Sequence, residues 1–177
     1  LHLVRRAGAA SARGGGGEPG FVDGQGAAAR FNEPVSVVVL PASGEFVVSD
    51  YDNHALRVVT LGGAVRTLAG SGQPGFADGQ GSAARFNSPM GLALDADGSV
   101  LVADFGNHAV RRVTMAGAVS TVAGNGQAGF ADGEGAAARF NSPEDVVVDK
   151  EGTMVVADSR NHRLRKIQGR QVTTLAG

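Results

Sequence analysis

The hydrophobic residues of this chain fall in short segments that turn residues separate. In the middle of the chain, apolar residues dominate positions 90–94, 99–103, 109–113 and 118–122. Each segment is too short for a typical helix and has the length of a strand. Turn signals lie between the segments, namely Asp95-Ala96-Asp97-Gly98, Gly106-Asn107 and Met115-Ala116-Gly117. The pattern predicts four strands in an antiparallel meander, with Asn107 in the left-handed conformation that closes the second turn.

Several of these segments are apolar at consecutive positions rather than at alternate ones. Val146-Val147-Val148 and Val155-Val156-Ala157 are two examples. Consecutive apolar residues are typical of strands that are covered on both faces. We therefore expect further sheets to stack on both sides of each four-stranded sheet.

One polar motif divides the chain into three similar units. The pattern Asp-x-x-Asn-His occurs three times, and its asparagines, Asn53, Asn107 and Asn161, stand 54 residues apart. The segment "ARFNEP" or "ARFNSP" begins at Ala29, Ala84 and Ala138, and so keeps this spacing except for one extra residue near Pro41. We expect one domain over residues 1–177, with units at about 20–70, 75–124 and 129–177. Residues 1–19 resemble the end of a preceding unit, with a strand at Leu3 to Arg6, followed by a glycine-rich loop.

Two local features modify the repeat. The long connector from Gly124 to Pro143 contains "GAAARF", for which we expect one helical turn. In the first unit, Leu40-Pro41 stands where the other units have an aspartate before the first hairpin. That turn is therefore expected to be built differently.

Stacked four-stranded units of this length predict an all-β fold of the β-propeller type. A blade typically has about 40 to 50 residues, and closed propellers contain roughly four to eight blades. Three blades alone would leave two apolar faces uncovered, which soluble monomers avoid. We expect a partial propeller that forms half of a six-bladed ring. Either further blades of a longer chain or a second copy of this chain would complete the ring. We favour the longer chain because of the strand expected at Leu3 to Arg6.

The stretch "PMGLALDADGSVLVADFGNHAVRRV" resembles the NHL repeat, a family named for an Asn-His-Leu signature. The resemblance implies a β-propeller, most often six-bladed, that serves chiefly as a platform for protein or RNA interactions. The chain departs from the signature at its third position, where Ala55, Ala109 and Arg163 replace leucine.

The repeated polar residues are interpreted as structural. We expect Asp104 to accept backbone N–H groups of the following turn, His108 to begin the third strand, and Arg111 to hold a neighbouring loop. Radial symmetry would spread such residues around a ring, whereas a catalytic or metal site needs groups that converge. The complete set is Asp50, Asn53, His54, Arg57, Asp104, Asn107, His108, Arg111, Asp158, Asn161, His162 and Arg165.

A second repeated group precedes each first strand. An arginine, Arg30, Arg85 or Arg139, is followed each time by phenylalanine and asparagine. We expect each phenylalanine to fill a gap between blades, while the arginine and asparagine satisfy loop carbonyls.

The leading hypothesis for function is a non-enzymatic scaffold that binds protein partners through its faces and loops, with no cofactor. The alternative is a hydrolase or lyase with a channel metal, because some propeller hydrolases hold calcium with carboxylates at the channel mouth. Glu144 and Asp145 are the candidate ligands, but Val35-Ser36 and Met90-Gly91 stand at the same place in the other units.

Composition narrows these hypotheses. The absence of cysteine excludes a disulfide scaffold, a thiol-ligated metal and a cysteine nucleophile. A net charge of −1 gives no general attraction to nucleic acid, which makes RNA the weakest alternative, although Arg160, Arg163, Arg165 and Lys166 form a local basic run. No apolar run is long enough for a membrane span or a signal peptide core, so we expect a soluble protein whose compartment stays unknown.

Overall fold

The computed structural model describes residues 17–177, which form three antiparallel sheets arranged as blades. The first blade contains β1 (Gly24–Gln25), β2 (Pro34–Val39), β3 (Phe46–Asp50), β4 (Ala55–Val59) and β5 (Ala64–Ala69). The second contains β6 (Gly79–Gln80), β7 (Pro89–Leu94), β8 (Val100–Asp104), β9 (Ala109–Val113) and β10 (Ala118–Ala123). The third contains β11 (Gly133–Glu134), β12 (Pro143–Val148), β13 (Met154–Asp158), β14 (Arg163–Gln168) and β15 (Gln171–Ala176).

Each blade has five strands, so the prediction of four was wrong by one short strand. The strand order in the first blade is β1-β5-β4-β3-β2, and the other two blades repeat it. The additional strands β1, β6 and β11 have two residues each and pair with the outermost long strand of their own blade. They belong to the glycine-rich connectors, which carry no hydrophobic alternation by which a strand could be predicted.

The helices in residues 17–177 are single 3₁₀ turns of three residues. Three of them, η1 (Gly26–Ala28), η3 (Gly81–Ala83) and η5 (Gly135–Ala137), lie in the connectors and confirm the helical turn expected there. The others, η2 (Tyr51–Asn53), η4 (Phe105–Asn107) and η6 (Ser159–Asn161), join the second long strand of each blade to the third. None of these turns is long enough to cross a membrane.

The first hairpin of each blade follows the sequence expectation. In the second blade, the Asp95 N–H donates to the Ser99 carbonyl at 2.8 Å, which makes a tight turn. In the first blade, the Leu40 N–H reaches Glu45 instead, at 2.8 Å, because this turn is one residue longer. The different construction predicted from Leu40-Pro41 is confirmed.

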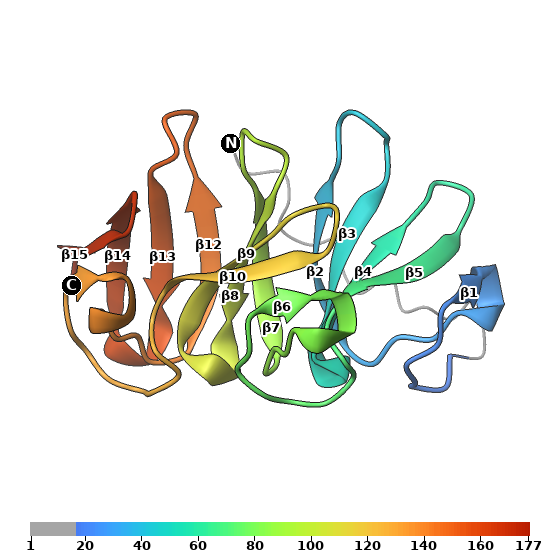
Figure 1. The fold of residues 1–177 in the computed structure, drawn as a ribbon, viewed down its shortest axis with the longest axis horizontal. Coiled ribbons are helices and arrows are strands. Elements are labelled where there is room, and N and C mark those ends of the chain that lie inside the picture. Colours follow the sequence, from blue (N-terminus) through green and yellow to red (C-terminus); the bar gives the residue numbers. More distant parts are fainter. Residues whose placement is uncertain (1–16) are drawn as a thin grey trace.

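The blades form an open fan, with the middle blade covered on both sides (Figure 1). The innermost strands β2, β7 and β12 lie next to one another along the inside of the fan. One apolar cluster fills the space between the first and second blades, and another fills the space between the second and third. Every residue of β8 is buried, whereas β3 and β13, in the end blades, alternate between buried and half-buried residues. Cover on both faces is therefore confirmed for the middle blade, whereas within residues 17–177 each end blade is covered on one face only.

Two sequence expectations lie outside the described residues. The strand at Leu3 to Arg6 falls within residues 1–16, and so does most of the glycine tract at 14–17.

Candidate functional site

The repeated polar residues meet in a buried hydrogen-bond cluster in every blade. In the middle blade, Asp104 ends β8, and its Oδ2 accepts hydrogen bonds from Asn107 Nδ2 at 2.8 Å and Arg111 Nη1 at 2.7 Å. Its Oδ1 accepts the Asn87 backbone N–H at 2.9 Å. The carboxylate therefore ties the connector before the blade to the turn and the strand that follow it.

Arg111 extends this cluster into the connector. Its Nη1 also donates to the Arg85 carbonyl at 3.1 Å, and its Nη2 donates to the Ala77 carbonyl at 2.9 Å and to Asp78 Oδ1 at 2.7 Å. The side chain has no exposed surface. Because one planar guanidinium serves two carboxylates and two carbonyls, a long connector without regular structure is fixed to the third strand of the blade.

Two aromatic rings enclose the same guanidinium. The Cζ atom of Arg111 lies 4.9 Å from the centroid of Phe76 and 5.3 Å from that of Phe86. Phe86 is fully buried and Phe76 is partly exposed. The rings offer their faces to the cation, a favourable contact that water cannot replace once the group is buried.

The first and third blades repeat these contacts. Asp50 and Asp158 accept hydrogen bonds from Arg57 and Arg165 at 2.7 and 2.8 Å. Asn53, Asn107 and Asn161 each donate a second hydrogen bond to a connector carbonyl, those of Gly20, Gly75 and Gly129 respectively. The same cluster is therefore a structural element of each of the three blades.

Burial and hydrogen bonding shift the pKa of the two aspartates of this cluster in opposite directions. Burial raises the pKa of Asp104 to about 6, and the interactions with Arg111 and Asn107 oppose that rise. Asp78 is half exposed. Burial raises its pKa less than the hydrogen bonds from Arg111 and Thr121 lower it, so the pKa of Asp78 lies below the usual value.

The sequence analysis missed this second carboxylate. Asp78 accepts hydrogen bonds from the backbone and hydroxyl of Thr121, at 3.1 and 2.9 Å, and so joins the connector to β10. The signal was present, since aspartate recurs in "GFVDG" and "GFADG" and threonine recurs in the outer strand. The complete set is Asp23, Asp78 and Asp132 with Thr67, Thr121 and Thr174.

Three details of the predicted cluster were wrong. Asp104 accepts a backbone N–H from the preceding connector, not from the following turn. The left-handed residue is His108, with φ 51°, and not Asn107, which lies inside the 3₁₀ turn η4. His108 therefore precedes the third strand, which begins at Ala109, because it must first end the 3₁₀ turn.

The left-handed histidines connect neighbouring blades. His54 Nδ1 accepts the backbone N–H of Ser88 at 2.9 Å, and His108 Nδ1 accepts that of Ser142 at 3.0 Å. Burial lowers the pKa of both histidines, which favours the neutral ring that an accepting Nδ1 requires. Each bond runs from one blade to the connector of the next.

The second repeated group also lies where blades meet. Phe86 and Phe140 are fully buried in the two clusters between blades, which confirms that they fill these gaps. Arg85 and Arg139 are exposed. Arg30 donates to the Glu18 carbonyl at 3.3 Å, so one of the three arginines has the expected loop contact.

The candidate metal ligands lie on the innermost strand of the third blade. Glu144 and Asp145 are both exposed, and Asp145 Oδ1 accepts the Val146 N–H at 3.0 Å. Asp145 also packs closely against Gly91 of the neighbouring blade. Within residues 17–177, no three histidine or acidic side chains come together as a metal site.

The turns β2–β3, β7–β8 and β12–β13 form one rim of the fan, which we call the hairpin rim. The first and last of these turns point to the top of Figure 1. Two adjoining hollows lie on this rim. The hollows measure about 310 and 500 Å³. Their apolar lining comes from Leu40, Leu94, Met115 and Val148, and charged residues at their edges are Glu45, Arg66, Asp149 and Lys150. Glu45, Asp149 and Lys150 also interact within their own turns, so the rim combines concave apolar surface with charged groups that its hairpins hold in place.

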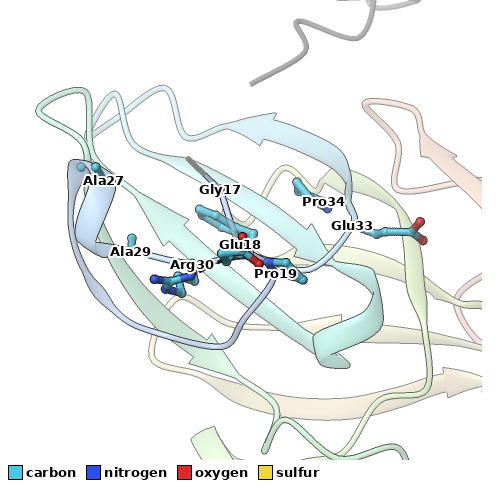
Figure 2. Close-up of a pocket in the computed structure, with 10 residues that line it drawn as sticks. Gly17, Glu18, Pro19, Ala27, Ala29, Arg30, Glu33 and Pro34 are labelled. Atoms are coloured by element: carbon cyan, nitrogen blue, oxygen red, sulfur yellow. Dashed lines mark hydrogen bonds between the residues drawn. The ribbon is translucent and has the colours of Figure 1, made fainter. Parts of the chain in front are cut away.

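Another hollow, of about 390 Å³, lies on the free face of the first blade (Figure 2). Ala27, Ala29 and Arg30 line one side of it, and Glu33 and Pro34 line the other.

Comparison with known proteins agrees with this architecture. The family model described as "NHL repeat" matches residues 31–59, 86–113 and 140–167, one match in each blade. The chain is 37% identical over 131 residues to NHL repeat-containing protein 2 of Bos taurus, which covers 71% of this chain and 18% of that protein. It is 30% identical over 148 residues to the protein SUPPRESSOR OF QUENCHING 1, chloroplastic, of Arabidopsis thaliana, covering 77% of this chain and 14% of that protein. The chain thus spans less than a fifth of either relative.

Solved structures share the same arrangement of blades. A protein of unknown function from Bacteroides thetaiotaomicron superposes with a TM-score of 0.67 at 28% identity, over 81% of this chain and 34% of that one. A gluconolactonase from Xanthomonas campestris superposes with a TM-score of 0.58 at 17% identity, over 87% of this chain and 49% of that one, a likeness that shows the fold alone. With one repeat match in each of three stacked blades, the chain belongs to the NHL-repeat family of β-propellers.

Proposed function

We propose that this chain is a protein-interaction scaffold that binds a partner through the hairpin rim. The observation that carries the proposal is the pair of adjoining hollows between the first hairpins of the three blades. An apolar floor with a charged edge is the usual composition of a protein-binding surface. The floor and edge are set by turns on a rigid scaffold, the usual location of recognition residues.

We further propose that the scaffold acts without catalysis. The repeated aspartates and arginines are the residue types that could act as acids, bases or anion-binding groups in a catalytic site. In this chain they instead form hydrogen bonds that hold the connectors against the blades. Asp145 is exposed, but its Oδ1 accepts the Val146 N–H and lies beside Gly91, so this oxygen already has a contact within the fold. Titration of the chain with calcium, measured by calorimetry, tests the proposal that the scaffold acts without a catalytic metal. A stoichiometric ion that is lost in Glu144→Gln with Asp145→Asn would instead support a hydrolase or lyase.

Two substitutions test the binding surface directly. Ala42 and Ala96 are exposed and line the hollows, so arginine at either position fills the space without disturbing the core. Proteins captured from cell extract on the immobilised chain would be identified, purified and titrated against it. We expect Ala42→Arg and Ala96→Arg to weaken the affinity of the partner by at least about tenfold.

The matched control is Ala128→Arg, which places the same side chain at an exposed position of the third connector. The next residue, Gly129, accepts a hydrogen bond from Asn161 of η6, at the end of the blade opposite the first hairpins. Its affinity should equal that of the unmodified chain. Equal affinities for all three variants would show that the partner binds elsewhere. Capture that ribonuclease abolishes would favour RNA as the ligand.

A further inference from the structure

The contacts between neighbouring blades leave little space around the glycines of the connectors. The Gly124 N–H donates to the Gly135 carbonyl of the third blade at 3.1 Å, and a Cβ atom on Gly124 would lie 2.5 Å from the His108 carbonyl. Together with the bond from the Ser142 N–H to His108 Nδ1, these contacts join the second blade to the third. We call each such set of contacts between two blades a junction.

The turn that follows Gly124 also packs on the middle blade. A Cβ atom on Gly126 would lie 3.0 Å from the ring of Phe76, whose centroid is 4.9 Å from Cζ of the buried Arg111. The backbone of residues 124–126 is therefore held between the junction and the ring that covers the polar cluster. A change in the length of this backbone would disturb at least one of these two contacts.

Asn125 lies between these two glycines, and of all asparagines in the chain it alone is followed by glycine. Glycine has no Cβ atom to obstruct its own backbone nitrogen, so the Gly126 nitrogen can approach the Asn125 side chain more closely than that of a bulkier residue. The equivalent residue of the preceding connector is Ser71, which has no side-chain amide. The sequence therefore allows a reaction between side chain and backbone at residue 125 that the preceding connector cannot undergo.

The structure leaves both reacting groups available. The Gly126 N–H donates no hydrogen bond to any of residues 17–177. The Asn125 Oδ1 atom accepts the Gln127 N–H at 3.1 Å, and this bond stabilises the negative charge that develops on the oxygen when Cγ is attacked. Asn125 and Gly126 are half-buried and Gln127 is exposed, so solvent reaches the turn.

The other asparagines lack this combination. Those of the polar clusters each donate two hydrogen bonds through Nδ2, to an aspartate and to a connector carbonyl. A residue bulkier than glycine follows each of the others, namely Asn32, Asn53, Asn87, Asn107, Asn141 and Asn161. Asn125 combines a glycine neighbour with an Nδ2 group that donates no hydrogen bond within residues 17–177.

We propose that Asn125 is a site of spontaneous modification, at which the amide is converted to isoaspartate and aspartate. Hydroxide removes the proton of the Gly126 amide, and the nitrogen attacks Asn125 Cγ. The N–Cγ bond forms, the Cγ–Nδ2 bond breaks, and ammonia leaves with a proton from water, which gives a cyclic succinimide. Water then opens the ring. Cleavage at Cγ gives aspartate, and cleavage at the backbone carbonyl carbon gives isoaspartate, in which the main chain runs through Cγ.

The two products differ in their effect on the fold. Aspartate adds a negative charge to the turn and keeps the length of the backbone. Isoaspartate adds the same charge and lengthens the main chain between Gly124 and Gly126, which lie against the His108 carbonyl and the Phe76 ring. We expect isoaspartate to loosen the junction or the cover of Arg111, so that the modified protein unfolds at a lower urea concentration.

The experiment incubates the folded chain at about pH 7 and about pH 8, and locates modified residues by digestion and mass spectrometry. We expect modification at Asn125, with a rate that rises about tenfold between the two pH values because the attacking nitrogen must be deprotonated. In water labelled with heavy oxygen, both products should carry the label. Chromatography of the digest separates the isoaspartate peptide from the aspartate peptide.

The matched control is Asn125→Gln, which keeps the amide but would have to close a larger ring, and which should stay unmodified. Asn125→Ser copies Ser71 of the preceding connector and removes the amide. After incubation, the parent chain should unfold at a lower urea concentration than before. Both variants should keep their urea midpoints.

Several outcomes would overturn the proposal. They are the absence of modification at Asn125, modification that begins only when urea unfolds the chain, equal modification at the other asparagines, and a rate that does not change with pH. A product without heavy oxygen would also overturn it, because ring opening by water is then excluded. A chain that contains isoaspartate and keeps its urea midpoint would overturn the link between this residue and the junction.

Discussion

Arg111 and Asp104 form an ion pair of 2.7 Å in which neither side chain is exposed. Burying two charges is costly unless every remaining donor and acceptor is also satisfied. Here the carboxylate accepts three hydrogen bonds and the guanidinium donates four. Of the polar side-chain atoms of this pair, only Arg111 Nε is buried without a hydrogen-bond partner. The pair is therefore part of a nearly complete network, and removing one partner leaves the other buried and charged.

Arg111→Lys should destabilise the protein strongly. Lysine keeps the charge, but its single ammonium cannot reach two carboxylates and two carbonyls in one plane, nor stack between two rings. We expect a loss of about 3 kcal/mol in the free energy of unfolding, measured by urea denaturation. The matched control is Arg112→Lys at the next residue, whose pairs with Asp95 and Asp97 are partly exposed. It should cost less than about 1 kcal/mol. Equal losses would contradict the role given to the buried network.

Asp104→Asn should also destabilise the protein, although the two side chains have the same shape. The carboxylate accepts hydrogen bonds on both oxygens, from Asn87, Asn107 and Arg111, and asparagine would place an NH₂ group against one of these donors. We expect a loss of about 2 to 4 kcal/mol in urea denaturation. Asp97→Asn, at a side chain that is 62% exposed, is the control and should change stability little. A stable Asp104→Asn variant would mean that Arg111 does not depend on this charge.

The repeat and the long strands could be predicted from the sequence because both produce a regular spacing of motif, apolar and turn residues. The spacing of the Asp-x-x-Asn-His motif and the turn residues between apolar segments fix the blades and their hairpins. The two-residue strands such as β6 could not be predicted, because they form where a connector happens to run beside an outer strand. Their pairing depends on the folded blade and not on a local preference.

The residues of the polar cluster could be predicted from the sequence, but their backbone conformations and hydrogen-bond partners could not. Local preferences favour asparagine over histidine for a left-handed residue, yet the 3₁₀ turn η4 includes Asn107 and moves that conformation to His108. The recurrence of Asp78 marks it as part of the repeat, but its partners Arg111 and Thr121 could not be identified from the sequence because they are distant along the chain. Contacts of this kind are decided when the connector folds back over the blade.

Gly124→Ala should test how tightly blades are packed at a junction. Gly124 has φ 97°, and a Cβ atom there would lie 2.5 Å from the His108 carbonyl. Gly98 also has a positive φ, of 82°, but a Cβ atom there would meet nothing within 4 Å. Gly98→Ala should therefore cost about 1 kcal/mol of backbone strain alone, and Gly124→Ala clearly more, in thermal or urea unfolding. Equal costs would show that the junction can relax.

The histidine that bridges two blades should make stability depend on pH. His108 Nδ1 accepts the Ser142 N–H, so a protonated ring would set a donor against a donor. Burial lowers the pKa of His108 from 6.5; Arg160 lowers it further, and Asp158 opposes both. Because the folded protein resists protonation, the contribution of this bond is complete above pH 6.5 and is lost as the pH falls through that value toward the lowered pKa.

His108→Asn separates this effect from every other titration. Asparagine tolerates the left-handed conformation and can offer Oδ1 to the Ser142 N–H, but it cannot be protonated. At about pH 8 the variant and the unmodified chain should have similar urea midpoints, and at about pH 5 the variant should be the more stable. The raised pKa of Asp104 acts with the opposite sign but is common to both proteins, so it cancels in the difference. The matched control is His162→Asn at the equivalent position of the third blade, where within residues 17–177 no backbone N–H donates to the histidine ring and no such bond can be lost. A midpoint difference for His108→Asn that stays constant between the two pH values would rule out the bridging role of the neutral ring.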